Sequence, residues 1–128
     1  MLTVTPIYAG LLGLLFAALS ARVILARKRL SISLGDGGAA DMERHIRIQG
    51  NCAEYAPLGL LLLAIAEMQG MPGWVVHLFG AMLFLGRVTH AWSLSQVPQN
   101  LSARVVGMGL TLGMIVTVAM ANILHALV

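Results

Sequence analysis

The chain has 128 residues, of which 59% are hydrophobic and 10% are charged, and its formal net charge at pH 7 is +3. Its mean hydropathy is +0.87, whereas soluble globular domains carry about 25% charged residues. This composition excludes a soluble domain and predicts an all-α integral membrane protein, with residues 1–128 forming a single four-helix domain. The one cysteine, Cys52, excludes an intrachain disulfide and a cysteine metal cluster.

The first predicted span covers residues 4–26, and the cluster Arg27, Lys28 and Arg29 follows it. Because this positive charge comes after the apolar run, we expect a retained anchor rather than a cleaved signal peptide. Glycines and Asp36 within residues 30–40 predict a chain reversal. Asp41 is the predicted N-cap of the second helix.

The second, third and fourth spans are predicted at residues 42–68, 74–92 and 103–127. Tryptophans at both ends of the third span are typical of interfacial anchors. In the fourth span, three glycines predict a face for close helix packing. These are Gly107, Gly109 and Gly113.

The second span begins with polar residues at helical spacing. About 100° of rotation per residue places five of them within roughly a third of a turn. They are Arg44, Arg47, Asn51, Glu54 and Tyr55. Because residues 58–66 contain no polar side chain, one helix carries this polar stripe from an interface into hydrocarbon, where unpaired polar groups are costly.

All eight basic residues lie on the side of the membrane that holds the first and third loops. By the positive-inside rule this side is cytoplasmic, and four spans return both termini to the opposite, periplasmic side. Because the arginines border apolar spans and no aromatic platform accompanies them, the positive charge indicates topology and no nucleic-acid partner.

Arginines converge at this cytoplasmic end from all four spans, and arginine is suited to binding carboxylates. They are Arg22, Arg44, Arg47, Arg87 and Arg104. One interpretation is a site for a zwitterion with excess negative charge, in which Glu54 accepts an ammonium group. The alternative is a structural network in which Glu54 pairs with Arg47 or Arg87. For Arg22, snorkelling to the interface competes with ligand contact. A proton-coupled transporter is a third interpretation, and no histidine spacing predicts a metal site.

The run R-x-x-x-N-C-x-E-Y-x-P, from Arg47 to Pro57, resembles the signature of the MAPEG family, the membrane-associated proteins in eicosanoid and glutathione metabolism. The motif is most similar to that of leukotriene C synthases. The segment GRVTH at residues 86–90 and Arg104 also resemble family features. The basic end of span one, the SLGDGG loop and RVVGMGLT resemble the small bacterial members, for which we expect a multi-pass inner-membrane location.

The resemblance implies a homotrimer that binds glutathione between subunits near the cytoplasmic face. The implied binding residues are Arg47, Asn51, Glu54 and Tyr55, with Arg22 as a further candidate. A cationic side chain beside the glutathione sulfur would stabilise the thiolate, the nucleophilic form. Arg104 is the first catalytic candidate and Arg87 the second. The implied activity is that of a glutathione transferase or peroxidase acting on lipophilic small molecules from the lipid phase.

The chain departs from the family pattern at two positions near this site. Only Tyr8 and Tyr55 are tyrosines, and Leu94 stands where catalytic members carry one. Gly50 replaces a basic residue that precedes the asparagine in some members. The family includes a noncatalytic lipid-binding protein, so the alternative function is lipid binding or scaffolding in the membrane on the same fold.

Overall fold

The structure is a computed structural model that describes residues 1–127. It contains four α-helices, whose bounds are α1 Thr5–Leu30, α2 Ala40–Met68, α3 Gly73–Ser95 and α4 Leu101–Leu127. All four are long and apolar enough to cross a membrane. The predicted all-α architecture is therefore confirmed, and the helices extend past the predicted spans by up to four residues.

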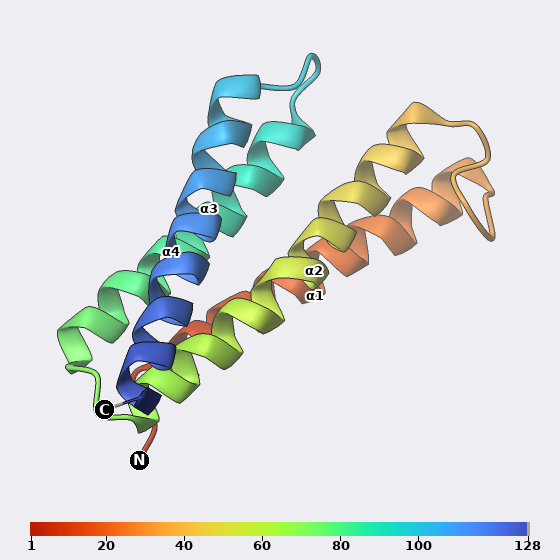
Figure 1. The fold of residues 1–128 in the computed structure, drawn as a ribbon. Helices are drawn as coiled ribbons and strands as arrows, with labels where there is room; N and C mark the ends of the chain where they lie inside the picture. Colours follow the sequence, from red (N-terminus) through yellow and green to blue (C-terminus); the bar gives the residue numbers. More distant parts are fainter. Residues whose placement is uncertain (128) are drawn as a thin grey trace.

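The helices form two antiparallel hairpins, α1 with α2 and α3 with α4, which lie together at one end and diverge toward the other (Figure 1). Both termini and the α2–α3 connection lie at the closed end. The α1–α2 and α3–α4 loops lie at the open end. Helices α2 and α3 are central because each packs against the other three helices, whereas α1 and α4 share no contact within residues 1–127.

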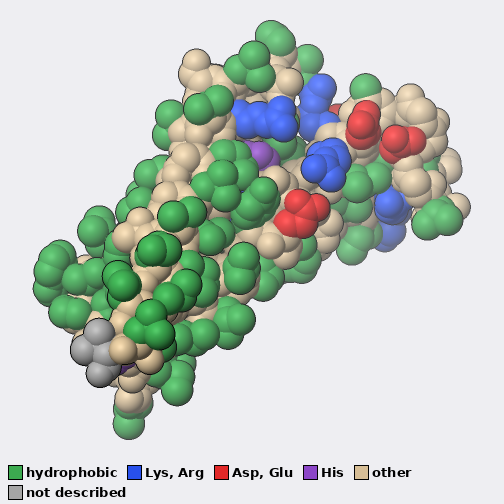
Figure 2. All heavy atoms as spheres, viewed as in Figure 1, with side chains coloured by type: hydrophobic (Ala, Val, Ile, Leu, Met, Phe, Trp, Pro, Cys, Tyr) green, Lys and Arg blue, Asp and Glu red, His purple; other side chains and the backbone are tan. Residues whose placement is uncertain are grey.

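Side chains with charge gather at the open end, and the rest of the visible surface is mainly hydrophobic (Figure 2). Leu14, Leu25 and Val105 are examples of large apolar side chains that are more than 60% exposed. In a soluble protein such a surface would promote aggregation, but it is the expected lipid-facing surface of a bundle with four membrane-spanning helices.

Helices α3 and α4 approach each other closely at two glycines, Gly86 and Gly107. A Cβ atom on Gly107 would lie 2.7 Å from the backbone nitrogen of His90 and 2.8 Å from the carbonyl oxygen of Gly86. The prediction of a glycine packing face is thus correct for Gly107 only. A Cβ on Gly109 would meet nothing within 4 Å, and one on Gly113 only a methionine methyl at 3.9 Å.

Glu67, near the end of α2, binds the start of α1. Its carboxylate accepts hydrogen bonds from the backbone N–H groups of Thr3 at 2.6 Å, Val4 at 2.8 Å and Thr5 at 2.8 Å. The first N–H groups of a helix have no partner within the helix, and a carboxylate also matches the positive end of the helix dipole. This contact joins residues more than 60 positions apart, so helical spacing in the sequence did not predict it.

The prediction of Asp41 as an N-cap was wrong. Helix α2 begins at Ala40 with Ala39 in the cap position, and no side chain caps it. Asp41 instead forms an ion pair with Arg29 at the end of α1. The preceding turn is closed by Asp36, whose Oδ1 accepts a hydrogen bond from the N–H of Gly38 at 2.9 Å. The turn function of Asp36 is the one expected from the sequence.

Candidate functional site

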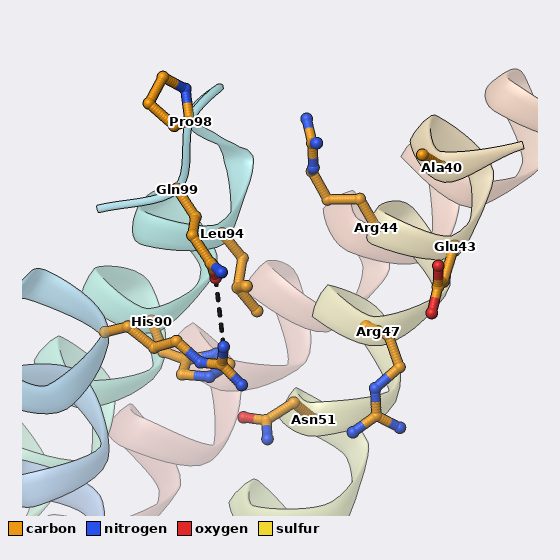
Figure 3. Close-up of a pocket in the computed structure, with 10 residues that line it drawn as sticks. Ala40, Glu43, Arg44, Arg47, Asn51, His90, Leu94, Pro98 and Gln99 are labelled. Carbon is orange, nitrogen blue, oxygen red and sulfur yellow. Dashed lines mark hydrogen bonds between the residues drawn. The ribbon is translucent and has the colours of Figure 1, made fainter. Parts of the chain in front are cut away.

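A polar cavity of about 460 Å³ lies at the open end, between the N-terminal part of α2 and the α3–α4 hairpin. Arg44, Arg47 and Asn51 from α2 face it on one side, with His90 and Leu94 from α3 on the other (Figure 3). The complete lining is Ala40, Glu43, Arg44, Arg47, Asn51, His90, Leu94, Pro98, Gln99 and Arg104. The cavity therefore joins side chains from two hairpins and from the last loop.

The cavity has an excess of positive charge. Three arginines line it, Arg44, Arg47 and Arg104, and Glu43 is the one acidic residue in the lining. No ion pair to these three arginines occurs within residues 1–127. The guanidinium groups are thus available to an anionic ligand, and their fork geometry suits a carboxylate.

Arg104 is held in position by the start of α4. The side chain of Asn100 caps this helix, because its Oδ1 accepts a hydrogen bond from the N–H of Ala103 at 3.0 Å. Arg104 follows in the first turn and donates from one terminal nitrogen to Oε1 of Gln99 at 3.2 Å, the contact drawn as a dashed line in Figure 3. One neutral contact leaves the other nitrogens of the guanidinium group free to bind a ligand.

Arg87 does not line the cavity but lies directly behind it, with only 2% of the residue exposed. Its Nε donates to Oγ1 of Thr111 at 3.0 Å, and one terminal nitrogen contacts the sulfur of Met108 at 3.2 Å. The other terminal nitrogen donates to Oδ1 of Asn51. Its guanidinium carbon lies 5.1 Å from the ring centroid of Tyr55, a cation–π distance. All these partners are neutral, so the charge of Arg87 has no carboxylate partner within residues 1–127.

The hydrogen bond from Arg87 fixes the orientation of the Asn51 side chain. Because its amide oxygen accepts from Arg87, its NH₂ group remains as a donor, and Asn51 also lines the cavity. Arg87 is thereby connected to the cavity through Asn51.

The remaining predicted site residues lie outside this cavity. Glu54 is exposed on α2, and no ion pair to it is found in the described part of the chain. Tyr55 is half-buried beneath Arg87. Arg22 donates to Oγ of Ser95 at 3.2 Å and so connects α1 to the end of α3. Within this chain the structure thus brings together Arg47, Asn51 and Arg104, with Arg87 behind them.

Six lining residues were not among the predicted site residues: Ala40, Glu43, His90, Leu94, Pro98 and Gln99. Glu43 lies one turn before Arg47, and its position on α2 was a usable signal. His90 lies three residues after Arg87, so a shared helix face was visible in the sequence. Gln99 reaches the cavity only through the path of the α3–α4 loop, for which helical spacing gives no signal.

These features define a class of protein: a four-helix integral membrane bundle with an arginine-rich cavity at one end of its spans. The model of the MAPEG family matches residues 5–124. The chain therefore belongs to the MAPEG family, as the motif at residues 47–57 indicated.

Two curated relatives are similar to this chain. Inner membrane protein YecN of Escherichia coli strain K12 is 38% identical over 87 residues, which cover 68% of this chain and 66% of the relative. The same protein from Escherichia coli O6:H1 gives the same values. The matched segment thus spans just under two thirds of each relative's length. The name of these relatives places them in the inner membrane and states no activity.

Proposed function

We propose that this protein binds glutathione in the arginine-rich cavity and uses its thiolate as a nucleophile toward lipophilic electrophiles. The observation that carries the proposal is the charge of the lining, three arginines and Asn51 with a single acid. Glutathione has two carboxylates and one ammonium group, so a ligand of this kind matches a cavity with more cations than anions. The volume of about 460 Å³ is also in the range for small-molecule sites.

Each polar residue has a role in this proposal. Arg44 and Arg47 bind carboxylates, and the NH₂ group of Asn51 donates to a carboxylate or peptide oxygen. Arg104 lies beside the sulfur, where its charge stabilises the thiolate against a free thiol pKa of about 8.5. The thiol proton leaves to solvent at the open end. The sulfur then forms a bond to an electrophilic carbon, and the leaving group departs with the electron pair of the bond that breaks.

Glu54 and Tyr55 enter the proposal through a homotrimer. Glu54 is exposed on α2, and every exposed side chain that follows it on this helix is apolar. An unpaired carboxylate at such a position is costly. In the proposed assembly it faces a glutathione molecule held between two subunits and accepts its ammonium group. Tyr55, beneath Arg87, supports the floor of the site.

A noncatalytic lipid-binding function is the second candidate, and Leu94 is the observation that favours it. Leu94 lines the cavity at a position where the sequence pattern of catalytic relatives predicts a tyrosine. An apolar wall provides no hydroxyl to bind the thiolate and is better suited to an alkyl chain.

Isothermal titration of glutathione into detergent-purified protein, with the thiolate absorbance recorded in parallel, tests the proposal. We expect binding together with a thiolate band at neutral pH. Arg47→Ala should weaken binding about tenfold or more through the loss of a charge-assisted hydrogen bond, and Glu54→Gln should weaken it as well. Arg29→Ala is the matched control, because Arg29 is exposed, pairs with Asp41 and lies outside the cavity.

The possible outcomes separate the two candidates. Binding without a thiolate band would leave a glutathione site without the proposed chemistry. No binding at millimolar glutathione, or unchanged affinity in both Arg47→Ala and Glu54→Gln, would contradict the glutathione site and favour lipid binding.

A further inference from the structure

A second concavity, of about 310 Å³, lies at the outer end of α1, away from the arginine-rich cavity. It is lined by Arg27, Lys28, Ser31, Ile32 and Ser33. The α1–α2 loop that forms it is at the far tip of the first hairpin (Figure 1). None of these residues contributes to the proposed glutathione site.

The loop holds this concavity in a defined shape. Ser31 adopts a left-handed conformation with φ of 56°, and the N–H groups of Ser31 and Ile32 bind the carbonyl oxygens of Lys28 and Arg27. These two carbonyl groups at the end of α1 are therefore satisfied and less able to repel an anion. Ile32 packs closely against Gly37, where a Cβ atom would lie 2.9 Å from the Ile32 side chain.

The three cations of the cluster at residues 27–29 are not equivalent. Arg29 forms an ion pair with Asp41. Arg27 donates to the carbonyl oxygen of Gly35 at 2.9 Å, which fixes its guanidinium group against the loop. Lys28 is exposed and forms no ion pair within residues 1–127. Lys28 is thus the cation of this cluster that is available to an external anion.

An exposed apolar stripe on α1 leads to Lys28. Leu14, Ala18, Ala21 and Leu25 are all exposed, and their spacing of three or four residues places them on the same helix face as Lys28. At a rise of 1.5 Å per residue the stripe from Leu14 to Lys28 is about 21 Å long. This length exceeds one leaflet of the hydrocarbon core, about 15 Å.

We propose that this face of α1 is a binding site for a phospholipid with an anionic headgroup. The phosphate lies against the Lys28 ammonium group with the hydroxyls of Ser31 and Ser33 as donors, and an acyl chain follows the stripe toward Leu14. The charge of Lys28 sets the preference for an anionic over a zwitterionic headgroup, because juxtamembrane lysines attract anionic lipids. The stems of Arg27 and Lys28, with Ile32, contact the apolar part of the headgroup region.

Native mass spectrometry of the detergent-purified protein tests this proposal, with phosphatidylglycerol and phosphatidylcholine titrated separately. We expect phosphatidylglycerol to be retained preferentially and Lys28→Gln to weaken its retention about fivefold. Arg29→Gln is the matched control, since it removes the same charge from the neighbouring position but from a residue already paired with Asp41. Lys28→Arg should restore retention.

Three results would overturn the proposal. Equal losses in Lys28→Gln and Arg29→Gln would mean that the cluster attracts anions only through its total charge. Equal retention of the two lipids would exclude a headgroup site. Displacement of phosphatidylglycerol by millimolar inorganic phosphate would assign the site to a free anion instead of a lipid.

Discussion

Arg87 and Asn51 should behave as one energetic unit. Asn51→Ala removes the acceptor of one guanidinium nitrogen of Arg87, which is only 2% exposed. A hydrogen bond to a charged group contributes about 1.5–3 kcal/mol, and the buried donor left behind adds a desolvation cost. We therefore expect Asn51→Ala to lower the free energy of unfolding by about 2–3 kcal/mol.

Arg87→Met should lower the free energy of unfolding by less, about 1 kcal/mol, because it removes the buried charge itself and keeps much of the side-chain volume. The Thr111 hydroxyl retains its bond to the carbonyl oxygen of Gly107 at 3.0 Å, and the freed Asn51 oxygen can be hydrated from the cavity. In the Arg87→Met background, Asn51→Ala should then lower the free energy of unfolding by about 0.5 kcal/mol or less. The double-mutant cycle thus predicts a coupling energy of about 2 kcal/mol.

Unfolding by SDS in mixed micelles, followed by circular dichroism, measures all four proteins of the cycle. Additive effects, with a coupling below about 0.5 kcal/mol, would refute the argument that Arg87 acts on Asn51. Glutathione titration adds a functional readout. Arg87→Met should weaken binding while the bound fraction keeps its thiolate band. Loss of the band at unchanged affinity would show that Arg87 acts on the sulfur directly.

Three further changes test the fold and the site. Gly107→Ala should lower the free energy of unfolding by more than about 2 kcal/mol, because the added methyl group overpacks against the backbone of His90. Gly109→Ala is the control. It lies at an open position and should be neutral or slightly stabilising in the same SDS titration. Glu67→Gln should increase the rate of amide hydrogen exchange at residues 3–5 at least tenfold, because it places an NH₂ group against backbone donors. An unchanged exchange rate would contradict the capping role of Glu67. Leu94→Tyr should strengthen the thiolate band of bound glutathione by adding a hydroxyl donor to the cavity, and an unchanged band would show that the side chain does not reach the sulfur.

Helices of this chain were predictable because each apolar run is long enough to span a bilayer and ends at glycine, proline or charge. The arginine-rich end was predictable for a related reason. Charges cannot be distributed along a lipid-facing span, so they concentrate at its end. The helical spacing of Arg44, Arg47 and Asn51 then placed three cavity residues on one face, and the structure has them together.

Contacts between residues distant in sequence were not predictable in this way. Glu67 binds residues 3–5, more than 60 positions away, and helical spacing contains no information about such a pair. Asp41 has the sequence signal of an N-cap, but in the structure its carboxylate forms an ion pair with the guanidinium group of Arg29 instead. The choice among Gly107, Gly109 and Gly113 depends on the rotation of α4 against α3, which the glycine spacing alone does not determine.

The two ends of the bundle are stabilised differently, and this difference positions the cavity. At the closed end, hydrogen bonds connect Glu67 of α2 to the start of α1 and Tyr8 of α1 to His77 of α3. A further hydrogen bond connects Asn122 of α4 to the carbonyl oxygen of Leu62 in α2. All four helices are therefore joined there. Toward the open end the hairpins separate (Figure 1), and the contact of Arg87 with Asn51 connects α3 to α2 at the base of the cavity. The hydrogen bond of Arg22 with Ser95 also joins the two hairpins, at the end of α3. The separation of the cavity walls therefore depends on these two contacts, because Arg47 and Arg104 are on different hairpins with no described hydrogen bond between them.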